Sequence, residues 1–477
     1  MELALTQQRR ELISRFGDMD AMRAMTQHRR GVLFDYFLAE LLTCHGIAAR
    51  ADVRGTGGRS QIDVAFAVGG RRFIAEAKWT ATPTNVEPIA KLNDRLSSRG
   101  EGTWGVIVSM SGYTAPVLDQ AAHSKWPRIL LLDRAHVEAI LSGLIDATAL
   151  LDRLLDHAAF EGGSYRAMNL CLPQGTSTPP RFVPSDRAEP PWPVVADAGR
   201  SARADLTGVG AWPEQSGMAG APDGNAAVTT SVGVVAVSVA TGDAGWLVPI
   251  VGCRSAPVVA PDGTVTVICG QAVIRWDDGD VNVVGGGFTG NSHLISGAGA
   301  TVWVFDQTGE RYASQLTLTR LGDRLGQEMR YAIRFNADVW CAAWLGGERF
   351  FLSASGHSAV VDLATAAPAG AEKAVDFVAV VEEADWIKMP HPAPRFAVPL
   401  NGRDVVTCSD SGSGIRSTVC LIDTESRRYR LLADLAVNRT FGIHRDRDGM
   451  LRVLADVRGN DAAALPVVIT LDAVTEG

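Results

Sequence analysis

Two carboxylates and a lysine occur close together in the stretch QIDVAFAVGGRRFIAEAKW, residues 61–79. Two apolar runs flank Gly69 and Gly70, and glycine accepts the positive φ angles that a two-residue hairpin turn needs. With these glycines as the turn, the pairing places Asp63 directly opposite Glu76. Lys78 then shares a face with both acids, because side chains alternate along a strand and paired residues share a face.

Two carboxylates and a lysine on one face predict a metal-assisted reaction at a phosphorus atom. Two opposed carboxylates destabilise a strand pair by about 0.2–1 kcal/mol, and a bound divalent cation would reverse that sign. Two carboxylates and a main-chain carbonyl suit a hard ion such as Mg²⁺, which keeps several waters. A lysine beside a metal-bound water could deprotonate it or stabilise a phosphorus-centred transition state. The opposite face of the hairpin is predicted to be apolar or small: Ile62, Val64, Phe66, Phe73, Ala75 and Ala77.

The segments around this hairpin predict an α/β layer structure that extends to about residue 170. Apolar residues at helical spacing predict helices over 30–46 and 88–99. Continuous apolar runs at 103–110 and 128–132 predict strands buried on both faces, with a helix over 116–123 between them. A last helix follows in AHVEAILSGLI. Strands that alternate with helices are typical of this fold class.

The order Ile-Asp, hairpin, Glu-x-Lys resembles the core motif of the PD-(D/E)xK nucleases. The wider context is similar to the Mrr-type restriction endonuclease branch. In that branch a helix with a Gly-x-x-Phe-acid pattern precedes the site, and this chain has GVLFD at 31–35. The strand and turn GVIVSMSGYT, 105–114, and the closing RILLLDRAHVEAIL also resemble the branch. The match covers roughly residues 28–145, and it implies a restriction-endonuclease-like fold.

The resemblance implies hydrolysis of DNA phosphodiester bonds with Mg²⁺, or Mn²⁺ in its place. Asp63 and Glu76 would be the metal ligands, with the Ala77 carbonyl assisting. Lys78 would position or activate the nucleophilic water. An acid on the preceding helix, Asp35, would complete the site.

Two positions depart from the pattern of the branch. The helix acid is commonly Glu, whereas this chain has Asp35, and Glu40 is a rival five residues further on. Many members of the branch have Gln where this chain has Glu76. The carboxylate at that position favours a complete metal site.

Basic residues near the N-terminus predict a local nucleic-acid surface. The whole chain has a net charge of −8. Residues 1–100 nevertheless hold about 15 Lys and Arg against about 11 Asp and Glu. The loop RGTGGR, 54–59, precedes the Asp63 strand and could contact the DNA backbone, although an ordinary solvated loop is the alternative. The predicted DNA-binding residues are Arg30, Arg54, Arg59 and Arg72.

A proline-rich stretch divides the chain. Residues 172–195 contain seven of the 22 prolines, and such segments are stiff and extended. We therefore expect a nuclease domain over 1–170, a linker over 171–200 and an all-β domain over 201–477.

The last segment predicts a β-propeller. Short apolar strands run into Asp- and Gly-containing turns, as in VAVSVATGD at 235–243 and VWVFDQTGE at 302–310. Their spacing of roughly 30–60 residues lies around the blade period of propellers, which predicts six or seven blades. The blades must close into a ring, with the C-terminal strand pairing with the first blade. A pair of β-sandwiches is the competing fold.

The remaining features narrow the class of protein. The seven cysteines show neither CxxC nor zinc spacing, which favours buried free thiols in a reducing cytosol. No apolar run has the length of a membrane helix or a signal peptide, so we expect a cytoplasmic protein without membrane contact. The cysteines are Cys44, Cys171, Cys253, Cys269, Cys341, Cys408 and Cys420.

The favoured hypothesis is a Mg²⁺-dependent DNA endonuclease in bacterial, including antiviral, defence or in DNA processing. Its propeller would act as a sensing or recruitment domain through contacts with a protein or peptide. Cutting both strands of a duplex needs two sites, which is consistent with a homodimer. The alternatives are a non-catalytic nucleic-acid-binding scaffold with a nuclease-like fold, an enzyme active at the propeller's central channel, and a surface hairpin whose charges simply face water.

Overall fold

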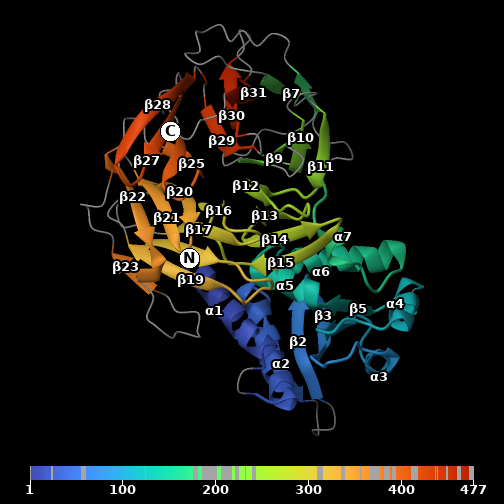
Figure 1. The fold of residues 1–477 in the computed structure, drawn as a ribbon. Coiled ribbons are helices and arrows are strands. Elements are labelled where there is room, and N and C mark those ends of the chain that lie inside the picture. The colour runs from blue at the N-terminus through green and yellow to red at the C-terminus, as the bar shows by residue number, and fades with distance from the viewer. Residues whose placement is uncertain are drawn as a thin grey trace.

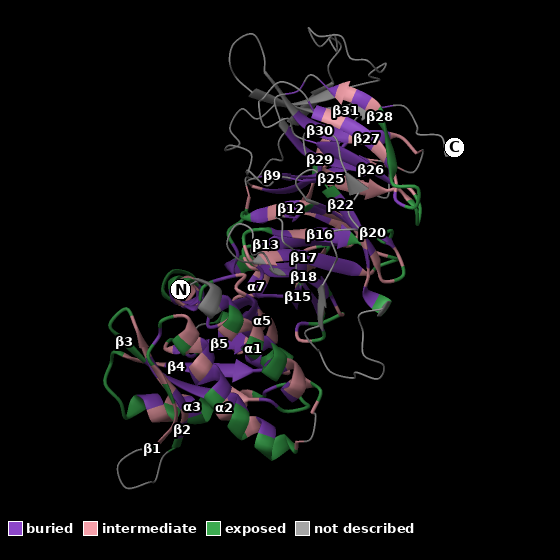
Figure 2. Cartoon of the chain, turned by 90° about the vertical axis from the view of Figure 1, so that its left-hand side faces the viewer, coloured by how far each residue is buried: buried purple, intermediate pink, exposed green. Residues whose placement is uncertain are grey.

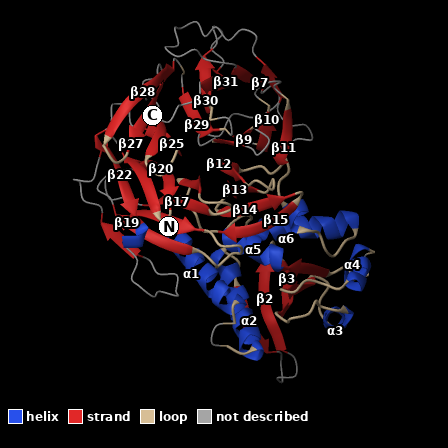
Figure 3. Cartoon of the chain, in the orientation of Figure 1, coloured by secondary structure: helices blue, strands red, loops and turns tan. Residues whose placement is uncertain are grey.

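The computed structural model places an N-terminal α/β domain beside a β-propeller (Figure 1). Helices are concentrated in the N-terminal domain, and the rest of the chain is built from strands (Figure 3). The structure describes residues 2–22, 25–54, 61–123, 125–175, 181–184, 201–205, 217–220, 225–230, 232–238, 243–308, 315–334, 339–354, 357–365, 377–380, 387–388, 394–409, 417–435, 437, 439–446, 449–458 and 464–471.

A mixed five-stranded sheet in the order β1-β2-β3-β4-β5 forms the centre of the N-terminal domain. The first three strands are antiparallel: β1 (Ala49–Arg54), β2 (Gln61–Val68) and β3 (Arg71–Lys78). The other two, β4 (Thr103–Ser109) and β5 (Ile129–Asp133), continue parallel to β3. Both are mostly buried, which confirms the prediction from their continuous apolar runs.

Helices cover both faces of this sheet. α1 (Glu2–Asp20) and α2 (Gln27–Cys44) share a core cluster with one face, and α3 (Val86–Ser97) and α4 (Ala115–Ala122) share another cluster with the opposite face. Three predicted helices are therefore confirmed as α2, α3 and α4, and α1 is an additional one. The domain ends with α5 (Arg134–Ser142), which confirms the fourth predicted helix, and then α6 (Ala147–Asp156), the π-helix η1 (His157–Glu161) and α7 (Met168–Cys171).

Within the described residues, six sheets of four or five strands follow in the propeller. The strands β8, β12, β16, β20, β25 and β29 contact one another in this order, and β29 returns to β8, so the sheets form a ring. The chain is thus a propeller and not a pair of sandwiches, and its number of blades stays a prediction.

The strands of the first three sheets are β8 (Met218–Gly220), β9 (Ala226–Thr230), β10 (Gly233–Val237), β11 (Ala244–Val248), β12 (Cys253–Val259), β13 (Val265–Cys269), β14 (Ala272–Asp277), β15 (Asp280–Gly285), β16 (Ser292–Ser296), β17 (Val302–Thr308), β18 (Gln315–Arg320), β19 (Met329–Arg334) and β23 (Phe377–Val380). Those of the other three are β20 (Val339–Gly346), β21 (Arg349–Ala354), β22 (His357–Asp362), β24 (Ile387–Lys388), β25 (Pro394–Pro399), β26 (Asp404–Ser409), β27 (Ser417–Asp423), β28 (Arg428–Leu435), β29 (Arg439–Arg445), β30 (Leu451–Arg458), β31 (Ala464–Leu471), β7 (Ser201–Asp205) and β6 (Arg181–Pro184). The 3₁₀ turn η2 (Leu363–Thr365) follows β22.

The C-terminal strand closes the ring. β31 pairs antiparallel with β7, which precedes β8 in the chain, and β7 pairs with β6. β6 lies within the stretch expected to be a linker, 171–200, most of which lies outside the described residues. No helix in the described parts of the chain is long and apolar enough to span a membrane.

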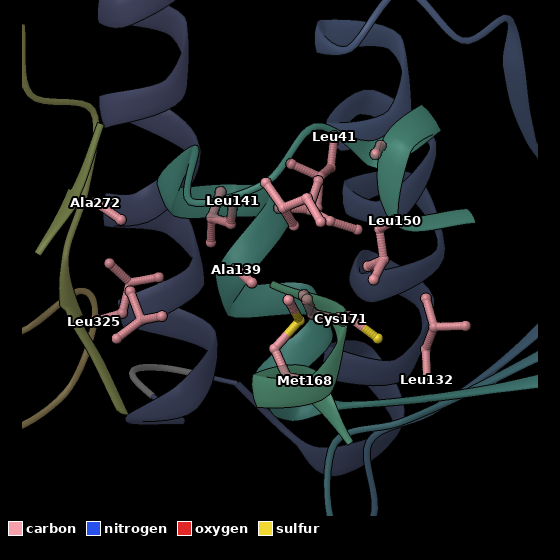
Figure 4. Close-up of a cluster of buried hydrophobic side chains, with 14 of the residues drawn as sticks. Leu41, Leu132, Ala139, Leu141, Leu150, Met168, Cys171, Ala272 and Leu325 are labelled. Carbon is pink, nitrogen blue, oxygen red and sulfur yellow. The ribbon is translucent and has the colours of Figure 1, made fainter. Parts of the chain in front are cut away.

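The two domains share one hydrophobic core. Leu141 and Ala139 of α5 belong to the same buried cluster as Ala272 and Leu325 of the propeller (Figure 4). Buried residues run through the strands of both domains (Figure 2). α1 reaches from α2 to the propeller, where Gly17 packs directly on the backbone of Gly326.

A buried ion pair joins α1 to the propeller. Arg10 pairs with the fully buried Asp306 of β17, and the Arg10 Nε–H also donates to the Gly287 carbonyl at 3.1 Å. Asp306 accepts further hydrogen bonds from the Thr289 backbone, at 3.2 Å, and from the Thr289 and Ser292 hydroxyls, each at 2.6 Å. α1 is therefore fixed to the propeller by polar contacts as well as by the shared core.

Candidate active site

The hairpin that carries the predicted site has the predicted register. β2 and β3 pair from Val68 with Arg71 to Val64 with Ala75, and the turn residues Gly69 and Gly70 have φ angles of 55° and 80°. A residue with a Cβ would be strained at both turn positions. The glycine turn therefore sets the register of these pairs, as the sequence predicts, but the predicted pairing of Asp63 with Glu76 is not part of the ladder.

The strand ladder is interrupted at Asp63. The paired positions of β2 and β3 end at Val64, and Asp63 Oδ2 instead accepts a hydrogen bond from the Ala77 backbone N–H at 3.0 Å. On the other side, the pairing of β1 with β2 skips Asp52, whose φ is 49°. An aspartate in the left-handed region within a strand marks a local distortion of that strand. The Asp63 carboxylate thus takes the place of a main-chain partner of β3.

This interruption changes which face Ile62 occupies. Ile62 is buried with Ile74 in the cluster under α3, whereas Val64 is buried in the cluster under α1 and α2. Regular alternation would place Ile62 and Val64 on the same face. The prediction that Ile62 shares the apolar face of Val64 is therefore wrong, because the strand departs from regular pairing at Asp63. The face of Glu76 also holds the buried Ile74, so that face is not purely charged.

The helix acid Asp35 lies near the hairpin charges. The apolar stripe of α2, which includes Phe34 and Phe37, packs toward the sheet and leaves Asp35 half-buried. Burial and the charge of Asp63, with a smaller effect of Asp52, together raise the pKa of the Asp35 carboxyl to about 7 against the opposing effect of Lys78. Asp63 and Lys78 therefore lie within electrostatic reach of Asp35.

The rival helix acid lies elsewhere. Glu40 pairs with Arg15 of α1 at 2.6 Å, and both side chains are exposed. Asp35, and not Glu40, is the acid of α2 that interacts with the hairpin.

Glu76 is held by two cations. Its buried carboxylate pairs with Arg95 of α3, and Lys78 Nζ lies 3.6 Å from its Oε2. Arg95 also approaches the Gln61 carbonyl, at 3.4 Å, so it links the end of β2 to β3. The sequence analysis did not identify Arg95. The signal that could have found it is its place beside Leu92 and Leu96, at the border of the buried stripe of α3.

The donor set fits a hard divalent cation only in part. No group of three or more His, Cys, Asp or Glu residues in the described ranges is arranged to hold a metal ion. Asp35 and Asp63 repel each other, and two carboxylates with water ligands suffice for Mg²⁺. The Glu76 carboxylate forms ion pairs with Arg95 and Lys78. The predicted roles of Glu76 and of the Ala77 carbonyl as metal ligands stay predictions.

The predicted DNA-binding arginines differ in their placement. Arg30 is buried, donates to the Trp79 carbonyl at 3.1 Å and stacks on the Trp79 ring, which is a packing arrangement. Arg54 and Arg72 are both exposed but lie at opposite ends of β2, since Arg54 pairs with Gln61 and Arg72 pairs with Ala67 beside the turn. Each could contact a phosphate backbone. Arg59 lies outside the described residues.

The raised pKa of Asp35 predicts a pH-dependent stability. Because the folded protein holds this carboxyl protonated to higher pH than the unfolded chain does, its contribution to stability falls as pH rises from about 4 to about 7. Asp35→Asn should therefore unfold at a higher urea concentration than the wild type at pH 8, with the difference vanishing near pH 4. Glu40→Gln, on the same helix, is the control. If Asp35→Asn and the wild type unfolded at the same urea concentration at pH 8, the ionised Asp35 carboxylate would not destabilise the folded protein.

No family model matches the chain, and no curated protein matches it. Solved structures match with low similarity. A gluconolactonase from Xanthomonas campestris is 14% identical with a TM-score of 0.39, covering 63% of this chain and 97% of that chain. An oligogalacturonate lyase in complex with manganese is 10% identical with a TM-score of 0.39, covering 63% and 99%. A protein of unknown function is 20% identical with a TM-score of 0.21, covering 27% and 78%. At these values none of them carries an argument about activity.

Proposed function

We propose that this protein is a metal-dependent endonuclease of the PD-(D/E)xK type that hydrolyses phosphodiester bonds in DNA. The observation that carries the proposal is that Asp63, where the strand ladder is interrupted, and Lys78 both lie close enough to Asp35 for their charges to act on its carboxyl. Two carboxylates that repel each other beside an ammonium group are the charges that metal-assisted hydrolysis of a phosphodiester needs. The order of the motif along the chain supports the same assignment.

Each residue would have a distinct task in this reaction. Mg²⁺ or Mn²⁺ would be held by Asp63 and Asp35, and when bound it acts as a Lewis acid and lowers the pKa of its water. The Ala77 N–H fixes the Asp63 carboxylate. The Lys78 ammonium would stabilise the negative charge that develops on the phosphate, and Glu76 would hold that ammonium in place.

The rest of the chain would serve recruitment. The propeller, which we propose has six or seven blades, would bind a protein or peptide partner and bring the nuclease domain to its substrate. The excess of acidic residues lies beyond residue 100, which disfavours the propeller as the main DNA grip. We further propose a homodimer, a cytoplasmic location and a role in bacterial antiviral defence.

A specific observation favours a second candidate, a nucleic-acid-binding scaffold without catalysis. Glu76 is occupied by Arg95 and Lys78, and the described residues contain no three-ligand metal group. If Glu76 never leaves these cations, the site would hold a metal weakly or not at all.

A substrate panel separates the two candidates. The full-length protein is incubated with supercoiled plasmid, linear duplex, single-stranded DNA and RNA, each with EDTA, Mg²⁺ or Mn²⁺. The endonuclease predicts nicked or linear plasmid with a metal and an intact plasmid with EDTA. Binding of DNA in a mobility shift, without cleavage under any metal condition, would favour the scaffold. Cleavage of RNA but not of DNA would support metal-dependent phosphodiester hydrolysis, with RNA as the substrate in place of DNA.

Arg95 is expected to lower the affinity of this site for Mg²⁺. Arg95→Ala removes a cation from Glu76 and frees its carboxylate, so Mg²⁺ should bind more tightly. The Arg95 side chain is 40% exposed, so we expect a gain of about 2–5-fold in Mg²⁺ affinity, equivalent to roughly 0.5–1 kcal/mol. Isothermal titration calorimetry measures this affinity. Lys91→Ala, which breaks the exposed pair with Glu87 on the same helix, is the matched control and should change nothing. Weaker Mg²⁺ binding by Arg95→Ala would instead assign Arg95 a supporting role.

A further inference from the structure

Two cysteines face each other on adjacent strands of the propeller. Cys253 of β12 and Cys269 of β13 are directly paired positions, and their Sγ atoms lie 2.6 Å apart. Both residues are only 2% exposed. Two sulfur atoms at this separation lie well inside the distance of an ordinary non-bonded contact between heavy atoms.

The strand register suits a covalent link at this position. The Gly270 N–H donates to the Gly252 carbonyl at 3.3 Å, so Gly252 and Gly270 form a hydrogen-bonded pair. The next pair, Cys253 with Cys269, is therefore a non-hydrogen-bonded pair, in which the Cα atoms are about 4.5 Å apart and the side chains approach most closely. A disulfide requires Cα atoms roughly 4.4–6.8 Å apart. The backbone thus meets this requirement without moving.

We propose that Cys253 and Cys269, which are free thiols in the structure, form a disulfide linking β12 to β13 when the chain folds under oxidising conditions, whereas a reducing cytosol keeps them as thiols. The oxidant would be a low-molecular-weight disulfide. One cysteine thiolate attacks it and releases one thiol, and the second cysteine attacks the resulting mixed disulfide and releases the other. The protein loses two hydrogens and two electrons pass to the oxidant, which becomes two thiols. Because both side chains are buried in the folded chain, the bond forms during folding, before β12 and β13 are covered.

The bond would lie beside the junction of the two domains. Cys269 directly precedes the β13–β14 turn, where the Gln271 N–H donates to the Gly143 carbonyl at the end of α5. The Gln271 side chain accepts from Arg9 of α1. The disulfide would fix the strand end that receives α1 and α5, and so strengthen the attachment of the N-terminal domain.

Peptide mapping tests the proposal on the full-length protein. The reduced, unfolded chain is refolded with glutathione disulfide, alkylated in denaturant without reduction, digested and analysed by mass spectrometry. We expect a linked peptide joining Cys253 to Cys269, five alkylated cysteines of the seven, and a mass lower by two hydrogens. Seven alkylated cysteines, or a link between other cysteines, would overturn the proposal.

Variants separate the pair from the other thiols. Cys253→Ser and Cys269→Ser should each abolish the linked peptide, and Cys341→Ser should retain it. If neither pair variant folds, the wild type is compared before and after reduction. The oxidised form should melt higher, by roughly 5 °C, since the link constrains the unfolded chain. Equal melting temperatures for forms proven oxidised and reduced would contradict the stabilising role at the junction.

Discussion

Replacing Lys78 by alanine is expected to lower metal-dependent DNA cleavage by about 10²–10³-fold, the usual cost of removing one group that stabilises transition-state charge. Lys78 Nζ lies 3.6 Å from the Glu76 carboxylate, and its charge also acts on the Asp35 carboxyl. Its removal leaves Glu76 paired with Arg95, so the hairpin should stay folded. The rate is measured by plasmid nicking at saturating Mg²⁺.

The control for this prediction is a lysine of similar size away from the hairpin. Lys91→Ala on α3 should cleave like the wild type, since Lys91 pairs only with the exposed Glu87 among the described residues. Circular dichroism and the melting temperature of Lys78→Ala check that the fold is retained. Cleavage at the wild-type rate by a folded Lys78→Ala protein would show that Lys78 takes no part in the reaction.

The second large effect is expected at the junction of the domains. Arg10→Ala leaves the fully buried Asp306 carboxylate without its cation, and such a loss typically costs about 3–5 kcal/mol. The free energy of unfolding from urea denaturation should fall by this amount, provided that the two domains unfold together. Their shared hydrophobic core makes a single transition the expectation.

A pair on the same helix provides the comparison. Arg15→Ala breaks the exposed pair with Glu40 and should cost no more than about 1 kcal/mol. Asp306→Asn, which keeps the hydrogen-bond acceptor but removes the charge, should make Arg10→Ala much less costly in the double variant. Equal, small losses for Arg10→Ala and Arg15→Ala would mean that the buried pair does not hold α1 to the propeller.

The hairpin was predictable because its determinants are local. Gly69 and Gly70 admit the turn, and the turn fixes the register from Val68 with Arg71 onward. The face of Ile62 was not predictable in the same way. It depends on the Asp63 side chain replacing a main-chain partner at Ala77, and alternation rules take no account of such a bond.

The other features of the site depend on contacts distant in the sequence. Sequence alone left Asp35 and Glu40 as rivals, and the choice follows from α1, whose Arg15 takes Glu40. Arg95 is 19 residues from Glu76 and pairs with it across the α3–sheet interface, which no local pattern encodes. Arg30 was predicted to bind DNA because it is basic, but it is buried against the Trp79 ring.

The propeller was predictable as a class and less so in detail. Its repeated turns follow from local Asp and Gly chemistry. Ring closure predicted that the C-terminal strand pairs with the beginning of the propeller, as β31 does with β7. The parallel pairing of β23 with β19 was not predictable, because such a long-range pairing leaves no periodic signal.

The central claim is that Asp35 and Asp63 form a cation site, and a Mn²⁺ titration tests it most directly. The melting temperatures of the wild type and Asp63→Asn are measured with increasing Mn²⁺, in the absence of DNA. Asparagine keeps an oxygen that can accept the Ala77 N–H, so the hairpin should be preserved. We expect Mn²⁺ to raise the melting temperature of the wild type and to leave that of Asp63→Asn unchanged. Equal shifts for both proteins, or no shift for either, would contradict the claim.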